Sequence, residues 1–222
     1  MKIKIGGASL EHDLRRIEAV VAHLTGSGHL AVDALNSHDP DMSLAAASAL
    51  AHFGLWRFED ICDPLDFGTH ARIAARYDPP IAAGEALFSA AEAELLGRYA
   101  GLRPAHDVLL FDPVHCYGLP GYLQIIERLT ATGWPRHAFW PHGCRLFSLH
   151  LGAALGLGGA EVNPLAFHPF HGPPAALPVT AGRIELPDVP GTVSSSTTRH
   201  GRHSDHCSRR PTDRPGCGCT GI

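Results

Sequence analysis

Three acidic residues recur at equal intervals along the chain. Asp33, Glu59 and Glu85 each stand at or near the end of a strand-like run. An interval of one strand–helix unit puts their carboxylates at the same level on neighbouring parallel strands. A single acidic strand end is usually a solvated loop residue, but three like charges in register repel one another unless a divalent cation neutralises them. Since an all-oxygen carboxylate set suits Mg²⁺, the spacing predicts a magnesium site.

The two lysines of the chain are both in its first strand-like run, and every other basic residue is Arg. A guanidinium group keeps its proton at accessible pH, whereas a desolvated ammonium group can release it. Lys2 and Lys4 are two positions apart, so in a strand they point to the same side. Two neighbouring ammonium groups in a partly dry site disfavour each other's charge. We therefore expect a lowered pKa for at least one lysine, which could then act as a base.

A histidine and an aspartate mark the opposite side of the same site. Asp112 ends the apolar run Val-Leu-Leu-Phe, and His142 stands in Trp-Pro-His-Gly at the end of the next run. An aspartate bonded to one ring nitrogen fixes the histidine tautomer and leaves the other nitrogen to exchange a proton. The chain has 16 histidines, so His142 is singled out only by its strand end and its partner.

A base, a metal and an acid in this order suit abstraction of the proton alpha to a carboxylate. The resulting enediolate needs stabilisation, which a bound divalent ion can supply. The opposed acid can return a proton, which gives racemisation, or protonate a leaving hydroxyl, which gives dehydration. The residues by themselves leave both reactions open.

Alternating strand-like and helical patterns predict the elements that must position these residues. A helix is expected from Leu10 to Leu24, with Ser9 as its N-cap and Gly26 as its stop. The repeated unit indicates an α/β protein with a parallel sheet, either doubly wound or a (β/α)₈ barrel. No glycine loop joins a strand to a helix in the way a dinucleotide site requires, so the polar strand ends favour the barrel mouth. The expected strands are 2–6, 29–35, 56–61, 80–87, 107–114, 137–142 and 159–163.

Composition excludes several other classes. The chain has 222 residues, 45% of them hydrophobic, and a formal net charge of −4, which is typical of a soluble globular protein without a nucleic-acid or membrane partner. No apolar run approaches the roughly 20 residues of a membrane span, and the first residues have no signal-peptide pattern. Scattered single cysteines (Cys62, Cys116 and Cys144) indicate reduced thiols. We therefore expect a cytoplasmic protein acting on a small molecule.

The composition changes abruptly after Gly191. Residues 192–222 contain no Ala, Leu or aromatic residue and are rich in Ser, Thr and Arg, so they cannot bury enough apolar surface to fold. We expect a catalytic barrel domain over 1–191 and a disordered tail over 192–222. The abrupt change in composition suggests the hypothesis that the tail is translated in a shifted reading frame. A zinc site in the tail is disfavoured because its Cys and His spacing fits no usual pattern. RNA binding by the tail is disfavoured because it has no aromatic stacking partner.

Over residues 1–191 the motifs resemble the mandelate racemase subgroup of the enolase superfamily. Besides Lys2-x-Lys4, the resemblance rests on Phe-Glu-Asp-Ile-Cys-Asp-Pro-Leu around Glu59 and Ala-Gly-Glu-Ala-Leu-Phe-Ser around Glu85. Three further segments resemble the tartrate-dehydrating members: Phe111-Asp112-Pro-Val-His-Cys-Tyr-Gly-Leu-Pro, Trp140-Pro-His-Gly and Leu157-Gly-Gly-Ala-Glu-Val-Asn-Pro-Leu-Ala-Phe167.

The resemblance implies a TIM-type barrel and a hydro-lyase activity. Lys4 would remove the proton, while Lys2 would contact the substrate carboxylate or tune Lys4. His142, with Asp112, would assist departure of the beta hydroxyl, and Glu161 would contact the substrate. Removal of water from a 2,3-dihydroxy acid such as D-tartrate would then give an enol that tautomerises to oxaloacetate. The metal, Mg²⁺, would lie on Asp33, Glu59 and Glu85.

Two departures from the family pattern shape these expectations. An Asp-Ala-Asn run of the family reads Asp33-Ala34-Leu35-Asn36 here. Members also carry an N-terminal capping domain and a first barrel strand ahead of the Lys strand, on which this sequence begins. We therefore expect an incomplete barrel, whose unpaired edges favour aggregation or pairing with another chain, such as a second copy in a homo-oligomer.

The same departures leave two alternatives to the tartrate dehydratase interpretation. One is an inactive remnant that keeps the ligands but shows weak or no turnover. The other is a racemase or dehydratase acting on another hydroxy acid.

Overall fold

The computed structural model describes residues 1–163 and 179–186. The chain divides into two units, one comprising Met1–Gly143 with Phe147–Glu161, and the other comprising Cys144–Leu146 with Val162–Ile222. The predicted boundary after Gly191 and the predicted tail lie outside the described residues and stay predictions.

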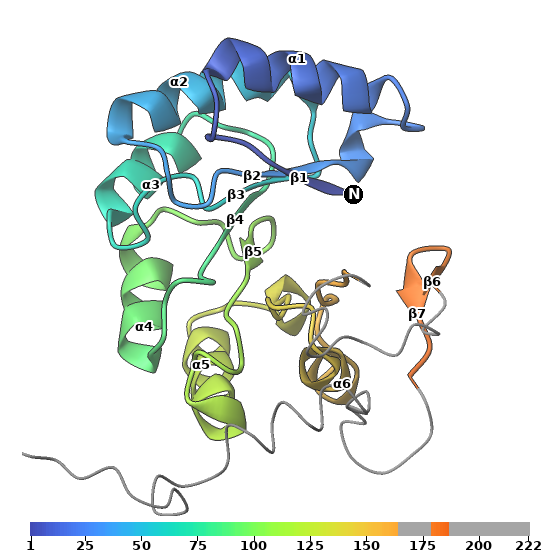
Figure 1. Ribbon diagram of the computed structural model, residues 1–222. Helices are drawn as coiled ribbons and strands as arrows, with labels where there is room; N and C mark the ends of the chain where they lie inside the picture. Colours follow the sequence, from blue (N-terminus) through green and yellow to red (C-terminus); the bar gives the residue numbers. More distant parts are fainter. Residues whose placement is uncertain (164–178, 187–222) are drawn as a thin grey trace, which may run out of the picture. The chain divides into compact units, whose positions relative to one another are not determined.

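A parallel five-stranded sheet organises the first unit, and its strands follow one another in chain order (Figure 1). This order, with a helix between successive strands, is the β/α repeat that the sequence predicts. A single parallel bridge between Leu109 and Phe139 continues the pairing beyond the last strand. The strands are β1 (Lys2–Lys4), β2 (Ala31–Asp33), β3 (Arg57–Glu59), β4 (Ile81–Ala83) and β5 (Val108–Leu109).

Helices connect the strands, and α1 to α4 follow one another along one side of the sheet (Figure 1). They are α1 (Leu10–Val21), α2 (Pro40–Leu50), α3 (Phe67–Ala74), α4 (Ala90–Tyr99), α5 (Gly118–Ala131) and α6 (Leu146–Ala154). Short 3₁₀ turns cover Ser27–His29, Ala51–Phe53 and Arg136–Ala138.

Side-chain caps fix where the first four of these helices begin. Ser9, Asp39, Asp66 and Ser89 each accept a hydrogen bond from the backbone N–H three residues further on. Each cap satisfies one of the amide groups that a helix N-terminus leaves unpaired. The predicted cap of α1 is thereby confirmed, although the helix ends at Val21, earlier than its apolar pattern suggests.

The two faces of the sheet have different chemistry because side chains alternate along a strand. Val32, Phe58 and Ile81 are buried in the main hydrophobic core together with residues of the covering helices. Ala82, Val108 and Leu110 form a separate small cluster with Trp140. Between the core positions of the first three strands stand charged side chains, namely Lys2, Lys4, Asp33, Arg57 and Glu59.

The strands are shorter than predicted because the backbone turns sharply after each of them. Gly6, Leu35, Asp60 and Gly84, one or two residues past β1 to β4, all have positive φ, between 49° and 120°. A left-handed residue takes the chain out of the extended conformation and ends the ladder. The polar residues that follow therefore lie in loops at the carboxyl edge of the sheet.

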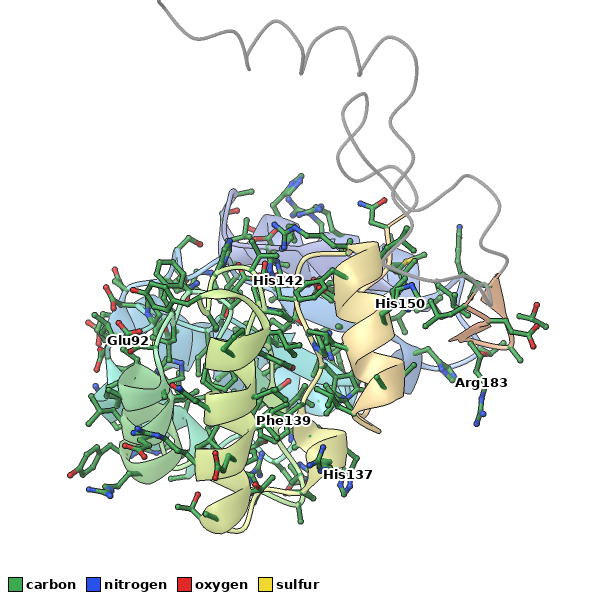
Figure 2. The ribbon with its side chains drawn as sticks, turned by 90° about the horizontal axis from the view of Figure 1, so that it is seen from below. Glu92, His137, Phe139, His142, His150 and Arg183 are labelled. Carbon is green, nitrogen blue, oxygen red and sulfur yellow. The ribbon has the colours of Figure 1, made fainter. Side chains whose placement is uncertain are left out.

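Two predicted strands are wrong as regular elements. In 137–142 only Phe139 forms a bridge, and residues 159–163 form no strand. Pro135 and Pro141 flank or lie within the first segment and supply no N–H to a ladder. The two segments are joined only by single bonds, from Gly158 N to Phe139 O and from Glu161 N to Pro141 O. Figure 2 shows His137 and His142 at opposite ends of the first segment.

The described part of the second unit contains a short antiparallel hairpin. It consists of β6 (Val179–Thr180) and β7 (Arg183–Ile184). The two turn residues, Ala181 and Gly182, both have positive φ, which suits a two-residue hairpin turn. Among the described residues of the whole chain, no helix is long and apolar enough to cross a membrane.

Candidate active site

Both lysines of β1 lie among acidic residues of the neighbouring strands. Lys4 pairs with Asp33 across the β1–β2 register. Lys2 pairs with Glu161, and its Nζ also lies 2.7 Å from Glu59 Oε2 and 3.4 Å from Asp33 Oδ2. The predicted placement of the two amines on the acidic side of the strand is confirmed, while their catalytic roles stay predictions.

The expected lowering of a lysine pKa is wrong for Lys2. Burial by itself would lower the pKa of this amine, but the Glu59 and Glu161 carboxylates outweigh burial and raise the pKa above its ordinary value. The interpretation from sequence considered the neighbouring ammonium group and left out the surrounding carboxylates. Lys2 is therefore suited to hold an anion as a cation.

Three carboxylates converge beyond the ends of β2, β3 and β4. One oxygen each of Asp33, Asp60 and Glu85 lies within 4.8 Å of the others. Asp60 Oδ2 is buried and accepts no hydrogen bond from the described residues. Burial, with the negative charge of Glu85 and Asp33 nearby, raises the pKa of Asp60 well above its usual range. A buried carboxylate without a donor, in an all-oxygen set, fits a hard divalent cation such as Mg²⁺.

This set differs by one residue from the set predicted from the sequence. Glu59 is not in this group; its Oε1 lies 2.8 Å from Arg57 Nη2 and its Oε2 lies 2.7 Å from Lys2 Nζ. Burial raises the pKa of Glu59 in spite of these two cations. Asp60 could have been considered from the sequence, because it forms an acidic doublet with Glu59 where β3 ends. Ligation by Glu59 stays a prediction.

Arg57 is a part of the site that sequence reasoning missed. Its side chain is buried, and the guanidinium carbon lies 4.2 Å from the ring centroid of Trp56 and 5.4 Å from that of Trp140. Contact with these two indoles, which also pack edge-on against each other at 5.1 Å, suits the planar guanidinium and compensates in part for its desolvation. Arg57 therefore holds Glu59 in place through an ion pair. An arginine two residues before a strand-end glutamate gave no distinctive signal in the sequence.

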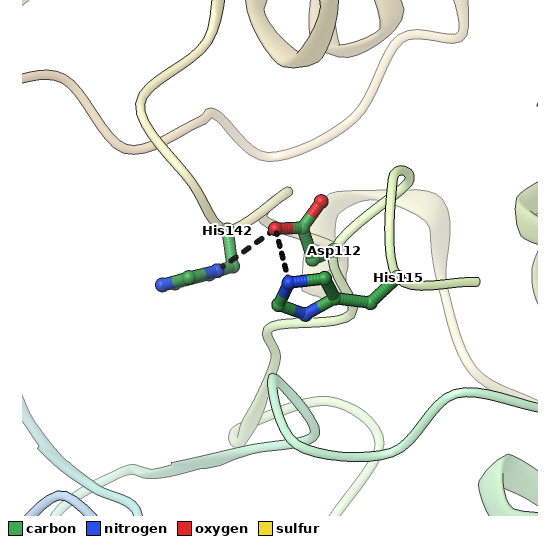
Figure 3. Close-up of side chains that lie close together, drawn as sticks. All are labelled: Asp112, His115 and His142. Atoms are coloured by element: carbon green, nitrogen blue, oxygen red, sulfur yellow. Dashed lines mark hydrogen bonds and ion pairs between the residues drawn. The ribbon is translucent and has the colours of Figure 1, made fainter. Parts of the chain in front are cut away.

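The predicted pair of His142 and Asp112 is present. His142 Nδ1 lies 3.2 Å from Asp112 Oδ2 (Figure 3), and its Nε2 lies 3.1 Å from Glu85 Oε2. Burial by itself would lower the pKa of His142, but the hydrogen bond to Asp112 and the charges of Glu85 and Glu161 raise it. The imidazole is thus held in a form that can donate a proton beside the carboxylate cluster.

Glu161 links the lysine side of the site to the histidine side. It pairs with Lys2, accepts a hydrogen bond from Gly143 N, and its Oε2 lies 3.7 Å from His142 Nε2. Burial would raise the pKa of Glu161, but Lys2 and His142 outweigh burial and lower it. The residue is therefore held as a carboxylate, and its contact with the substrate stays a prediction.

The extra residue in Asp33-Ala34-Leu35-Asn36 occupies a defined turn. Leu35 is half exposed and has a φ of 54°, and its N–H donates to Asp33 Oδ1 over 2.8 Å. Asn36 also has positive φ. The added leucine thus orients one oxygen of Asp33 through its backbone and places no apolar side chain in the core.

The described site as a whole has more carboxylates than fixed cations. Lys2, Lys4 and Arg57 face Asp33, Glu59, Asp60, Glu85, Asp112 and Glu161. Amine and imidazole stand at two ends of one carboxylate cluster. Such a site can bind a divalent cation together with a small anion, and can move protons at both ends.

The sequence profile of the enolase C-terminal domain-like family matches residues 1–193. L-Talarate/galactarate dehydratase of Salmonella typhimurium is 32% identical over 154 residues, which cover 69% of this chain and 37% of that protein. Arabinonate dehydratase of Saccharolobus solfataricus is 26% identical over 197 residues, covering 86% of this chain and 51% of that protein. This chain spans about half or less of the length of these relatives.

A solved structure shares the same arrangement. L-Talarate dehydratase from Polaromonas sp. JS666, complexed with Mg and L-glucarate, matches with a TM-score of 0.77 at 27% identity, covering 91% of this chain and 54% of that chain. The predicted α/β fold of the TIM-barrel type is confirmed, and the magnesium in this neighbour agrees with the predicted cofactor of the family. D-Tartrate is not the compound named for any of these three proteins, so that specificity stays a prediction.

Proposed function

The chain belongs to the enolase C-terminal domain-like family, and we propose that it forms the catalytic barrel part of a Mg²⁺-dependent acid-sugar dehydratase acting on a 2,3-dihydroxy acid such as D-tartrate. One observation carries the proposal. The Lys4 amine on Asp33 and the His142 imidazole on Glu85 stand at two ends of a single carboxylate cluster. Dehydration needs a base and an acid so arranged.

The metal would be held by Asp33, Asp60 and Glu85, with Glu59 as the alternative third ligand from β3. Bound there, Mg²⁺ would supply positive charge to stabilise the negative charge that develops on the substrate carboxylate. The buried, undonated Oδ2 of Asp60 supports this assignment, because such an oxygen is costly to bury without a partner.

Lys4 is the proposed base. Its side chain is about half exposed, unlike the acidic residues around it, so it can reach a bound substrate. It takes the proton on the carbon alpha to the substrate carboxylate. Lys2, whose pKa is raised, holds that carboxylate as a cation, and Glu161 orients Lys2.

His142 is the proposed acid. It gives a proton to the beta hydroxyl, the carbon–oxygen bond breaks, and water leaves. Asp112 keeps the imidazole oriented through Nδ1 and stabilises its cationic form. The enol product then tautomerises to a 2-keto acid, which is oxaloacetate when the substrate is D-tartrate.

The test is an assay of the purified chain with Mg²⁺ against D-, L- and meso-tartrate, galactarate and other acid sugars, with 2-keto acid formation as the readout. Lys4→Arg keeps the charge on Asp33 but cannot release a proton, so we expect it to lower the rate by about 10²- to 10⁴-fold, as Lys4→Ala and His142→Asn also should. The matched control, Arg98→Ala on the exposed side of α4, should leave the rate unchanged. Full turnover by Lys4→Ala would refute the base assignment.

The competing proposals give different results in the same experiment. A racemase would exchange the alpha proton for deuterium in D₂O and change the configuration without forming keto acid. An inactive remnant would bind Mg²⁺, measured by titration calorimetry, but would neither exchange the proton nor form product with any acid sugar.

A further inference from the structure

His115 lies next to Asp112 and His142, but it has no role in the proposed dehydration. It follows Asp112 by three residues in the loop between β5 and α5, and its side chain is 39% exposed. We propose that Asp112, His115 and His142 form a second metal site, which takes a transition-metal ion such as Zn²⁺ and is separate from the magnesium ligands.

The ligand atoms of this site already have suitable spacing. Asp112 Oδ2 lies 3.2 Å from His142 Nδ1 and 3.7 Å from His115 Nε2 (Figure 3). The three residues each offer one ligand atom within 4.8 Å of the others. Two ligands at about 2.0–2.1 Å from a tetrahedral zinc ion are roughly 3.3–3.5 Å apart. The two Asp112 separations are within a few tenths of an ångström of this spacing, and the two imidazoles would move toward each other to complete it.

The outer contacts of both imidazoles are those of metal-bound histidines. His142 Nε2 lies 3.1 Å from Glu85 Oε2, and His115 Nδ1 lies 3.4 Å from the backbone oxygen of Glu85. Ligating histidines usually present their second ring nitrogen to a carboxylate or a carbonyl, which leaves the lone pair of the first nitrogen for the metal. Asp112 is oriented as well, because its Oδ1 accepts a hydrogen bond from Val114 N.

The donor types select the metal. Two imidazole nitrogens and one carboxylate suit Zn²⁺, Co²⁺ or Ni²⁺, whereas the all-oxygen set of Asp33, Asp60 and Glu85 suits Mg²⁺. Three protein ligands leave a fourth position for water or an anion. The partial exposure of His115, whose ring packs edge-on against Phe88 at 5.2 Å, opens that position to solvent.

Occupation of this site would switch off the proposed acid. A metal on His142 Nδ1 prevents the imidazole from taking the second proton that it needs as a cationic acid. Zn²⁺ should therefore inhibit dehydration while Mg²⁺ stays bound. The inhibition rests on the proposed function, whereas the binding of the metal does not.

The test is a titration of the chain with Co²⁺ in excess Mg²⁺, which occupies the carboxylate site, followed by visible absorption. All proteins carry Cys207→Ser, Cys217→Ser and Cys219→Ser, so that no thiolate of residues 192–222 contributes. We expect the intense spectrum of a four- or five-coordinate Co²⁺ complex with nitrogen ligands, removed by one equivalent of Zn²⁺. His115→Asn should weaken Co²⁺ binding by roughly 100-fold, since loss of even outer partners costs about 10- to 100-fold.

His137→Asn, which replaces an exposed histidine at the far end of the same segment as His142, should bind Co²⁺ as the parent does. Equal Co²⁺ affinity of the parent and His115→Asn, or only the weak spectrum of an octahedral oxygen site, would overturn the proposal. A measurement of activity distinguishes the second metal site from the dehydratase function. His115→Asn should keep Mg²⁺-dependent turnover and lose inhibition by Zn²⁺, whereas a chain without turnover that still gives the His115-dependent spectrum contradicts only the dehydratase function.

Discussion

At the scale of single residues, the third acidic position decides how a cation would be held. Glu59 and Asp60 are adjacent in the chain but serve different neighbours. Glu59 forms ion pairs with Lys2 and Arg57, whereas Asp60 lies in one group of carboxylates with Asp33 and Glu85. A bound cation would relieve the repulsion among the three grouped carboxylates, and this makes Asp60 the residue whose removal should matter most for the metal.

We expect Asp60→Asn to weaken Mg²⁺ binding by roughly 100-fold, because a charged ligand becomes neutral. In metal-free protein the same change should not lower the free energy of unfolding, since it replaces a carboxyl whose raised pKa reflects burial beside Glu85 and Asp33. Titration calorimetry and urea unfolding in EDTA measure the two effects. Glu59→Gln is the matched comparison, and a larger loss of Mg²⁺ affinity in that variant would return the ligand role to Glu59.

His70 gives a prediction about pH that is independent of the active site. It is a buried residue of α3, with Nδ1 3.0 Å from Asp66 O and 3.2 Å from Cys62 Sγ. Burial lowers the pKa of His70 in the folded chain, while the unfolded chain has a pKa of about 6.5. Above this value both states are neutral; below it the unfolded state binds the proton first, so folding stability must fall as the pH falls.

The free energy of unfolding should therefore decrease between pH 7 and pH 5, and His70→Gln should make that decrease smaller. Urea unfolding at a series of pH values gives the slope. His52→Gln, at an exposed histidine after α2, serves as the control and should leave the slope as it is. An unchanged slope in the His70 variant would show that the acid sensitivity comes from other groups.

At the scale of elements, caps and turns bring the functional loops to one edge of the sheet. The helix after β4 begins with a complete capping box. Ser89 Oγ accepts from Glu92 N, and Glu92 Oε2 accepts from Ser89 N. The box fixes the start of α4 shortly after the loop that carries Glu85. It therefore also fixes where that loop ends.

Ser89→Ala should lower the free energy of unfolding by about 1 kcal/mol, the usual effect of losing an N-cap. Because the two side chains act together, the Ser89→Ala, Glu92→Ala double variant should lose less than the sum of the single changes. Thermal or urea unfolding provides the values. Ser48→Ala, at an exposed position within α2, should change stability by no more than about 0.5 kcal/mol.

At the scale of the whole molecule, the first unit of the structure lies within the matched family domain. The first unit ends at Glu161, and the family match extends to residue 193. The division of the chain into a catalytic domain over 1–191 and a tail stays our proposal. It rests on the loss of apolar residues after Gly191 and on the match to the family.

Removal of residues 192–222 should leave the unfolding temperature and the Mg²⁺ affinity of the chain unchanged, because the segment has almost no apolar surface to contribute. Circular dichroism during heating and calorimetry with Mg²⁺ test this. Loss of cooperative unfolding in the shortened chain would show that the segment is part of the folded domain and that the boundary is placed wrongly.

The repeat of strand and helix and the capped start of α1 could be predicted from the sequence. So could the approach of five side chains to one another, namely Lys4, Asp33, Glu85, Asp112 and His142. These follow from local rules, because alternation along strands and parallel order put strand ends at one edge. The prediction of regular strands at 137–142 and 159–163 was wrong. Whether a segment forms a strand depends on the backbone bonds that its neighbours offer, and these become known only in the folded chain.

Two features become visible only in the folded chain: which neighbouring acid joins the carboxylate cluster, and that the pKa of Lys2 is raised rather than lowered. Both depend on contacts between residues far apart in the chain, such as Lys2 with Glu161 and Arg57 with the indoles of Trp56 and Trp140. Electrostatic energies in a buried site are set by distances of a few ångströms and by the removal of water. Neither the distances between side chains nor the extent of their desolvation can be read from spacing along the sequence.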